Sequence, residues 1–252
     1  MGEQQSGWGG QPVYVVDGSR TPYIKARGKP GPFSASDLAI AAGQPLLARQ
    51  PFAAAELDEV ILGCMMPSPD EANIARVVAL RLGCGERVPA WTVQRNCASG
   101  MQSIDSAAQN IASGRSGLVL AGGVESMSRA PILFNDTMVN WLAALARART
   151  PGAKLKVIGS LRPGHFKPVI ALLRGLTDPT VGLSMGQTAE ILAHRFGITR
   201  EMMDSFAMRS HQRLDYGQQH GHLDEIEVMY DNRGNVYDHD DGVRADSSME
   251  KL

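Results

Sequence analysis

The chain has 252 residues and a net charge of −1, from 25 Lys and Arg residues against 26 Asp and Glu residues. This length allows one large domain or two smaller ones, and the balanced charge argues against a general nucleic-acid binder. The apolar run 117–121 is far shorter than the ~20 residues of a membrane-spanning helix. The three cysteines form no C-x-x-C pair, which excludes a zinc ribbon or disulfide framework and favours a reducing, cytoplasmic location.

The N-terminal residues 1–12 are rich in Gly and Gln, so we expect them to be disordered and to lack a signal peptide or mitochondrial presequence. The first six residues fit the pattern for N-myristoylation. We interpret that match as chance, because the pattern is short and a single acyl chain anchors a protein weakly.

Residues 13–131 alternate short apolar runs with helical patterns, which predicts an α/β fold with a layered mixed or parallel sheet covered by helices. In the third predicted helix, an apolar face is expected from Met101, Ile104, Ala107, Ala108 and Ile111. The predicted strands are 13–17, 59–63, 90–94 and 118–121, and the predicted helices are 37–49, capped by Ser36, 72–82 and 101–113.

The charge distribution changes after residue 131. Residues 137–177 contain seven Lys and Arg residues and no acid, whereas residues 201–252 contain twelve acids against five Lys and Arg residues. Two helices are predicted at 186–196 and 200–220, followed by a hairpin over 224–237. We therefore expect a separate α-rich domain over 132–245, with 246–252 starting a further part.

Cys97 lies in the most informative segment, a tight turn between a predicted strand and an amphipathic helix. The unpaired N–H groups of a helix N-terminus favour an anion, so they favour the thiolate. The small residues 98–100 leave room for a substrate, and the backbone N–H of Cys97 can donate to an oxyanion. The pattern suits an acyl-transfer nucleophile, although such a cysteine is also common as a packed core residue.

These residues resemble the thiolases, the acyl-CoA C-acyltransferases. The resemblance begins with Asn-Cys-Ala-Ser-Gly at 96–100 and Ala-Gly-Gly-Val-Glu-Ser-Met-Ser-Arg-Ala-Pro at 121–131. It continues in register with further motifs at 20–22, 88–93, 185–190, 210–212, 224–226 and 242–244. The series covers residues 13–252 and corresponds to the N-terminal half and loop domain of the family.

The resemblance implies that Cys97 attacks an acyl-CoA thioester and carries the acyl group. The reaction would be 3-ketoacyl-CoA thiolysis or acetyl-CoA Claisen condensation, as in fatty acid β-oxidation or synthesis, with coenzyme A as substrate or product and no bound cofactor. Ser184 and Met185 fall where the family lines the pantetheine and acyl pocket. Arg244 and Ser248 fall near residues that contact CoA.

The basic segment 137–177 is interpreted as a docking surface for the phosphates of CoA. A solvated surface is the simpler alternative. A membrane-surface or partner-docking insertion is a third, because the apolar run 169–173 adjoins the charges. As partners we expect acyl-CoA and CoA, with a homo-oligomer or a missing C-terminal half, and neither a nucleic acid nor a membrane surface.

The family's second half normally supplies an activating histidine, an Asn-containing oxyanion element and a second, acid/base cysteine. None of these occurs in this sequence, so we expect little or no turnover by this chain alone. His165 imitates the histidine motif but is interpreted as a loop or ligand-adjacent residue, and Cys84 as structural. Gln94 stands where the family commonly has Asn.

No metal is implied by the sequence. The acidic stretch 238–242 lacks the acids that a calcium loop needs at its first and last positions, and no P-loop motif occurs. Two alternatives to a thiolase stay open. One is a non-catalytic CoA- or acyl-binding or assembly module, and the other is a condensing enzyme like the β-ketoacyl synthases.

Overall fold

The structure, a computed structural model, describes residues 10–252, so the myristoylation pattern and most of the N-terminus expected to be disordered lie outside the described residues. The chain forms two compact units. The sheet unit comprises residues 10–129 and 200–252, and the inserted unit comprises residues 130–199. The expected domain boundary at residue 245 differs from this division, in which residues 200–252 group with the sheet.

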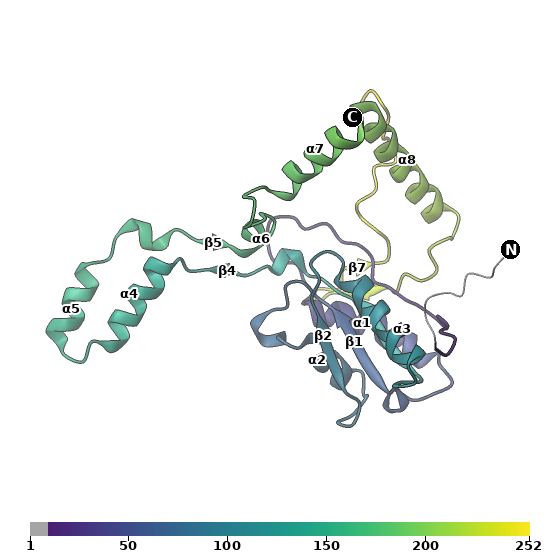
Figure 1. Cartoon of the computed structure of the whole chain (residues 1–252), viewed down its shortest axis with the longest axis horizontal. Helices are drawn as coiled ribbons and strands as arrows, with labels where there is room; N and C mark the ends of the chain where they lie inside the picture. Colours follow the sequence, from purple (N-terminus) through teal and green to yellow (C-terminus); the bar gives the residue numbers. More distant parts are fainter. Residues whose placement is uncertain (1–9) are drawn as a thin grey trace. The chain divides into compact units, whose positions relative to one another are not determined.

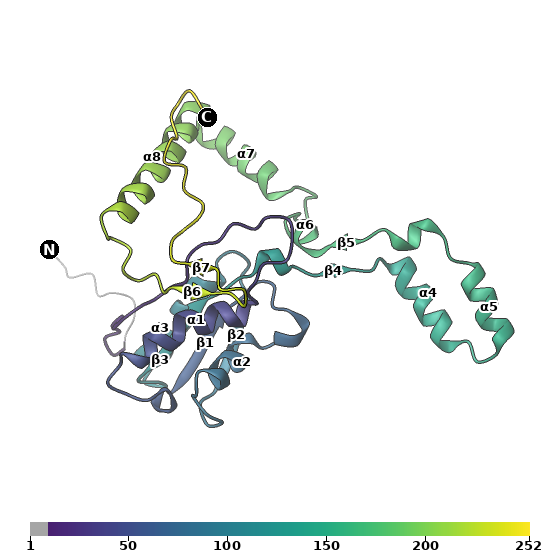
Figure 2. The ribbon, with the colours of Figure 1, turned by 180° about the vertical axis from the view of Figure 1, so that it is seen from behind.

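The sheet unit is built on three parallel strands in the order β2-β1-β3. Figure 1 labels β1 and β2, and Figure 2 also labels β3. They are β1 (Glu59–Gly63), β2 (Ala90–Val93) and β3 (Val119–Gly123). Helix α2 (Ile74–Arg81) connects β1 to β2, and helix α3 (Ser99–Ala112) connects β2 to β3. The predicted strand–helix alternation and the parallel sheet are confirmed.

The two crossover helices lie on opposite faces of the sheet. The chain moves across the sheet in one direction from β1 to β2 and in the other direction from β2 to β3, and both connections are right-handed. Alternate residues of β1 therefore face α2 on one side of the sheet and α3 on the other. Val60 and Leu62 belong to the buried core with Ile74 and Val78 of α2. Gly63, on the other face, is covered by the start of α3.

Helix α1 (Ala35–Ala48) packs beside α2 and has Pro45 inside it. Its N-cap is Ser34, not the predicted Ser36, and Ser34 and Asp37 form a reciprocal capping box. Ser36 is buried instead, where its hydroxyl donates to the Glu71 carboxylate. The predicted N-cap lies two residues too far along the chain, because both serines precede the apolar pattern of the helix.

The predicted strand at 13–17 is wrong. These residues form no strand, and the exposed fractions of Tyr14, Val15 and Val16 are 77%, 89% and 75%. An apolar run becomes a strand only when a neighbouring strand accepts its backbone hydrogen bonds. In the described part of the chain, β3 pairs on one side only and residues 13–17 have no partner strand.

The C-terminal part of the sheet unit is held to its N-terminal part by buried ionic contacts. Arg20 donates to both carboxylate oxygens of Asp240, at 2.8 and 3.0 Å, and to Glu225 at 2.9 Å. Asp240 also accepts from the Tyr23 N–H at 2.7 Å and is 3% exposed. These contacts explain why residues 200–252 belong to the sheet unit. Residues 200–252 contain α8 (Arg200–Gln219) and the hairpin strands β6 (Met229–Tyr230) and β7 (Val236–Tyr237), as predicted.

The inserted unit is mostly helical (Figure 2). Short antiparallel strands β4 (Ile132–Leu133) and β5 (Val169–Ile170) enclose two helices, α4 (Asp136–Arg147) and α5 (Pro151–Gly159). Helices α6 (Ala171–Gly175) and α7 (Met185–Phe196) follow. Short 3-10 helices occur in the two units at Ala54–Glu56, Pro69–Glu71, Met127–Arg129 and Pro163–Phe166. Within residues 10–252, no helix has the length and apolar character needed to cross a membrane.

Candidate active site

Cys97 is placed at the turn from β2 into α3. The turn requires Asn96 to adopt the left-handed region at φ 49°, which asparagine tolerates better than most residues. The Asn96 N–H donates to the Gln94 side chain at 3.1 Å. Gln94, at the position where the family commonly has Asn, therefore stabilises the turn. The Cys97 side chain is exposed, as a nucleophile for a separate substrate requires.

Two strand-end glycines let α3 approach the sheet closely beneath this turn. A Cβ atom on Gly63 would lie 2.2 Å from the carbonyl atoms of Ser99. A Cβ atom on Gly123 would lie 2.7 Å from the Gly100 Cα. Any larger residue would push the start of α3 away from the sheet. The position of Cys97 therefore depends on both glycines.

Two buried serines fix the first turn of α3. The Ser99 hydroxyl donates to the Asn96 carbonyl at 2.7 Å and accepts from the Arg95 N–H at 2.8 Å. The Ser103 hydroxyl contacts the carbonyls of Gly100 and Gly122 at 2.7 and 2.6 Å, which joins the helix to the end of β3. Sequence reasoning noted Ser99 only as a small residue that leaves room for a substrate, and it did not single out Ser103 or Gly63. The sequence signal for this close packing was the glycine that ends each of the strands β1 and β3.

The predicted apolar face of α3 is only partly the face that meets the sheet. Ala107 is buried, but Met101 is 71% exposed and Ile104 is 49% exposed. Ser103 and Asn110 are buried in their place. The close approach at Gly63 and Gly123 leaves room only for small side chains, so the larger apolar residues are displaced to the surface.

The start of α3 presents backbone donors beside Cys97. Within residues 10–252, the N–H groups of Cys97, Gly100 and Met101 have no hydrogen-bond acceptor. Donors at a helix N-terminus favour an anion. They can therefore donate to a carbonyl oxygen that becomes negative beside Cys97.

A proton acceptor for Cys97 is missing from the described part of the chain, where no side chain hydrogen-bonds to its Sγ. His165 lies in the inserted unit, where its Nδ1 accepts from the Arg162 N–H at 3.0 Å. His165 belongs to the short 3-10 helix Pro163–Phe166, and its ring nitrogen caps the start of that helix. The described residues thus place an exposed thiol beside free backbone N–H groups, without a side chain positioned to take its proton.

The other two cysteines have structural environments. Cys64 is 1% exposed, and its Sγ lies 3.7 Å from Glu125 Oε1. Burial, together with the negative charge of Glu125, raises the pKa of Cys64 to about 12. Cys84 is buried at the end of α2 and burial raises its pKa as well, in agreement with its structural interpretation.

Ser184 and Met185, the predicted pocket residues, begin α7 in the inserted unit. Ser184 is the N-cap, and its hydroxyl accepts from the Gln187 N–H at 3.3 Å within a capping box. Met185 is 43% exposed. The cap explains why a helix begins here, and the assignment of both residues to a substrate pocket stays a prediction.

Arg244 and Ser248, the predicted CoA contacts, begin two successive turns of the sheet unit near residue 250, closed by Ser247 N–H to the Arg244 carbonyl and by Lys251 N–H to the Ser248 carbonyl. The Arg244 N–H donates to His211 Nδ1 at 3.2 Å, and its side chain is exposed. Among the described residues, its guanidinium has no ion-pair partner. Ser248 is half-buried, and its hydroxyl lowers the pKa of Glu250. The CoA-binding role of these residues stays a prediction.

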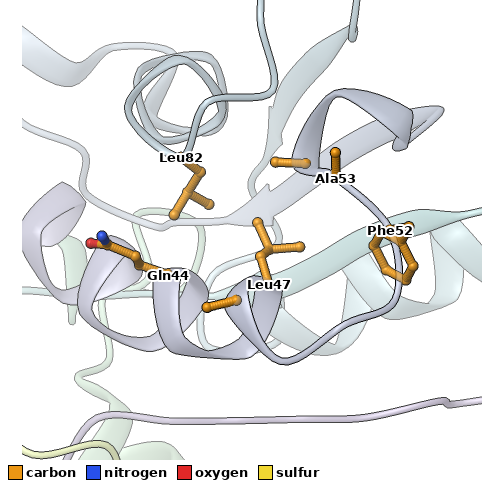
Figure 3. Close-up of a pocket in the computed structure, with 7 residues that line it drawn as sticks. Gln44, Leu47, Phe52, Ala53 and Leu82 are labelled. Carbon is orange, nitrogen blue, oxygen red and sulfur yellow. The ribbon is translucent and has the colours of Figure 1, made fainter.

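Residues 10–252 include two shallow hollows, and neither is lined by Cys97. The larger has a volume of about 260 Å³ and lies between α1, the loop around Phe52 and Leu82 at the end of α2 (Figure 3). The smaller, of about 130 Å³, lies along α8.

An exposed cysteine on a strained strand-to-helix turn, beside free helix N–H groups, is an arrangement typical of a nucleophile site in an α/β protein. Residues 13–252 match the family model for the N-terminal domain of thiolase. The chain belongs to the thiolase family, which confirms the resemblance seen in its sequence motifs.

Individual relatives agree with this assignment. The chain is 32% identical over 244 residues to a 3-ketoacyl-CoA thiolase of Yersinia enterocolitica, covering 96% of this chain and 55% of the relative. It resembles the structure of Bacillus anthracis acetyl-CoA acetyltransferase with 33% identity and a TM-score of 0.75, covering 92% and 55% of the two chains.

The human mitochondrial 3-ketoacyl-CoA thiolase, solved in complex with CoA, is also similar, with 30% identity and a TM-score of 0.75. The match covers 93% of this chain and 55% of that one. The chain thus spans about half the length of the relatives that it matches.

Proposed function

We propose that this chain carries the nucleophile of an acyltransferase that acts on CoA thioesters. The exposed Cys97 at the start of α3 supports this proposal most directly, because the motif around it and its geometry both suit acyl transfer. The similar proteins named 3-ketoacyl-CoA thiolase and acetyl-CoA acetyltransferase support the substrate class.

In the proposed thiolytic direction, the Cys97 thiolate adds to the 3-keto carbon of a 3-ketoacyl-CoA. The keto oxygen becomes negative and accepts from the Cys97 N–H. The C2–C3 bond then breaks, so that the shortened acyl group stays on Cys97 and acetyl-CoA leaves as an enolate that takes up a proton. A CoA thiolate attacks the acyl-cysteine and releases the shortened acyl-CoA.

In the condensing direction, Cys97 accepts an acetyl group from acetyl-CoA and expels the CoA thiolate. A second acetyl-CoA loses a proton from its methyl group, and the resulting carbanion attacks the acetyl-cysteine. The bond between the acetyl carbon and the Cys97 Sγ then breaks, which gives a 3-ketoacyl-CoA and releases the Cys97 thiolate. Both directions need a positioned group that moves a proton. Because no side chain within residues 10–252 hydrogen-bonds to the Cys97 Sγ, we infer that turnover requires residues beyond those described.

The predicted CoA contacts belong to this proposal. Arg244 has an exposed guanidinium suited to a phosphate group, and Ser248 begins the turn that follows it. Met185, exposed at the start of α7, is suited to an apolar acyl or pantetheine segment. Met101 and Ile104 add an exposed apolar strip on α3 next to the nucleophile, which suits a second protein segment that completes the site.

The experiment is peptide-resolved mass spectrometry after incubation with acetyl-CoA and with a 3-ketoacyl-CoA. We expect an acyl adduct on Cys97 and none on Cys64 or Cys84, which serve as internal controls in the same protein. Cys97→Ala should abolish the adduct. A folded chain that binds CoA saturably but forms no adduct would support the non-catalytic binding module instead.

A further inference from the structure

Helix α8 holds the backbone of the 240–252 segment through three of its side chains. The hydrogen bonds run from Arg200 to the Leu252 carbonyl, from the Arg244 N–H to His211 Nδ1 and from Gln218 to the Asp240 carbonyl, at 2.6, 3.2 and 3.1 Å. Residues 200, 211 and 218 are spaced by nearly whole helical turns at about 3.6 residues per turn, so they share one face of α8. This face therefore contacts the segment at both of its ends and near its middle.

The middle contact fixes the backbone of Arg244. A backbone N–H can only donate, so His211 Nδ1 is the acceptor, and the imidazole is neutral with its proton on Nε2. The Arg244 carbonyl in turn accepts from the Ser247 N–H at 3.1 Å. Both backbone polar groups of Arg244 are thus engaged, one by α8 and the other by the turn that Arg244 begins.

These contacts leave the side chain of Arg244 available to a ligand. The residue is exposed, and within the described part of the chain its guanidinium forms no ion pair. A guanidinium binds phosphate through directed, often paired hydrogen bonds, so its affinity depends on where the backbone places it. The hydrogen bond to His211 is the link from α8 that sets this backbone position.

We propose that His211 is a positioning residue for CoA, because it holds the backbone of Arg244 where the guanidinium meets a CoA phosphate. The inference rests on the proposed contact between Arg244 and CoA. His211 acts through Arg244 and not on the reacting atoms. The motif at 210–212, which the proposed acyl transfer leaves unused, thereby takes part in substrate binding.

A purely structural role for His211 makes a different prediction. If the residue only stabilised the fold, its loss would weaken the binding of every ligand alike. Positioning of Arg244 affects only ligands that carry a phosphate. Pantetheine has the thiol arm of CoA without its nucleotide and phosphates, so a comparison of the two ligands separates these roles.

The test is isothermal titration calorimetry of the full chain with CoA and with pantetheine. Arg244→Ala should weaken CoA binding by about tenfold or more, the loss expected for a hydrogen bond to a charged group. His211→Leu should weaken CoA binding by about three- to tenfold, because the guanidinium is present but no longer held in place. Pantetheine affinity should stay within about twofold in both variants.

His211→Asn is the rescue variant. Asparagine carries Oδ1 on Cγ, where histidine carries Nδ1, so it can accept from the Arg244 N–H and should keep CoA affinity within about twofold. Leucine has a higher helix propensity than histidine, so a loss in His211→Leu does not come from a weaker helix. The matched control is His220→Leu, which removes a ring whose contacts, among the described residues, are with Tyr216 and His222. It should bind CoA normally, and circular dichroism checks that each variant is folded.

Hydrogen exchange measured by mass spectrometry reports the position of the turn without any ligand. Overlapping peptides across 242–248 resolve the Arg244 amide. It should exchange at least about fivefold faster in His211→Leu, because its acceptor is gone, and at an unchanged rate in His211→Asn and His220→Leu.

Two results would overturn the proposal. The first is an unchanged exchange rate of the Arg244 amide in His211→Leu. The second is a CoA affinity that stays constant in that variant or falls equally with the affinity for pantetheine. If instead Arg244→Ala leaves CoA binding unchanged, or the unaltered chain does not bind CoA, the proposed CoA contact itself is wrong and the role of His211 in CoA binding is wrong with it. The exchange measurement and the Arg244 variant therefore tell the two failures apart.

Discussion

The substitution Gly123→Ala examines the close approach that positions the nucleophile. The new Cβ would lie 2.7 Å from the Gly100 Cα and 3.3 Å from the Gly100 N, and both are backbone atoms that no rotamer change can move. The neighbouring Gly122→Ala is the matched control, because its Cβ would meet only the Leu62 Cδ2 at 3.7 Å, an ordinary contact.

We expect Gly123→Ala to lower the free energy of unfolding by about 1–3 kcal/mol, the range for overpacking at a closely packed site. Gly122→Ala should be neutral or stabilising by up to about 1 kcal/mol, because alanine has less freedom than glycine in the unfolded chain. Urea unfolding followed by circular dichroism measures both values.

A second measurement links stability to the site. Because the start of α3 must shift in Gly123→Ala, the rate of Cys97 alkylation by iodoacetamide should change in that variant and stay constant in Gly122→Ala. If the two alanine variants unfold at the same urea concentration and react at the same rate, the packing of Gly123 against Gly100 does not position Cys97.

Three further predictions concern the turn, the cysteines and the buried ion pair. Asn96→Val should cost about 1–2 kcal/mol because φ is 49°, whereas Asn96→Gly should be neutral, as compared by thermal unfolding. Iodoacetamide should label Cys97 long before Cys64, whose burial raises its pKa to about 12, and equal labelling would contradict the assigned environments. Burial raises the pKa of Asp240, but the hydrogen bonds from Arg20 and the Tyr23 N–H outweigh it and hold that pKa below its usual value. This stabilisation is therefore present above about pH 4 and is lost as pH falls through the lowered pKa, and Asp240→Asn should flatten this part of an acid-unfolding curve.

The central elements of the sheet unit could be predicted from sequence because their signals are local. The strand at Glu59–Gly63 is an apolar run that ends in glycine, and its residues are buried on both faces of the sheet. The same reasoning failed for residues 13–17, which have an equally apolar run. A strand needs a neighbour, and the sequence of the strand itself does not reveal whether one is present.

The candidate site likewise has one feature that the local sequence predicts and one that depends on neighbouring elements. The turn with Cys97 was predictable, because Asn and Gly next to a short apolar strand mark a tight turn into a helix. The sheet-facing side of α3 was not, because the pattern ranks Met101 and Ile104 as more apolar than Ser103. Only the backbone approach of Gly63 and Gly123 explains why serine is buried there and methionine is exposed.

The contact between Arg20 and Asp240 has a consequence for how the chain folds. The residues are 220 positions apart, whereas β1 and β2 pair across about 30 positions. Closing the longer loop costs about 1.8 kcal/mol more in chain entropy, because this cost rises with the logarithm of loop length. The three parallel strands and their helices can therefore assemble while the chain is still being synthesised, since all of them precede residue 124. The ion pair can form only after residue 240 has been synthesised, and until then Arg20 lacks this partner.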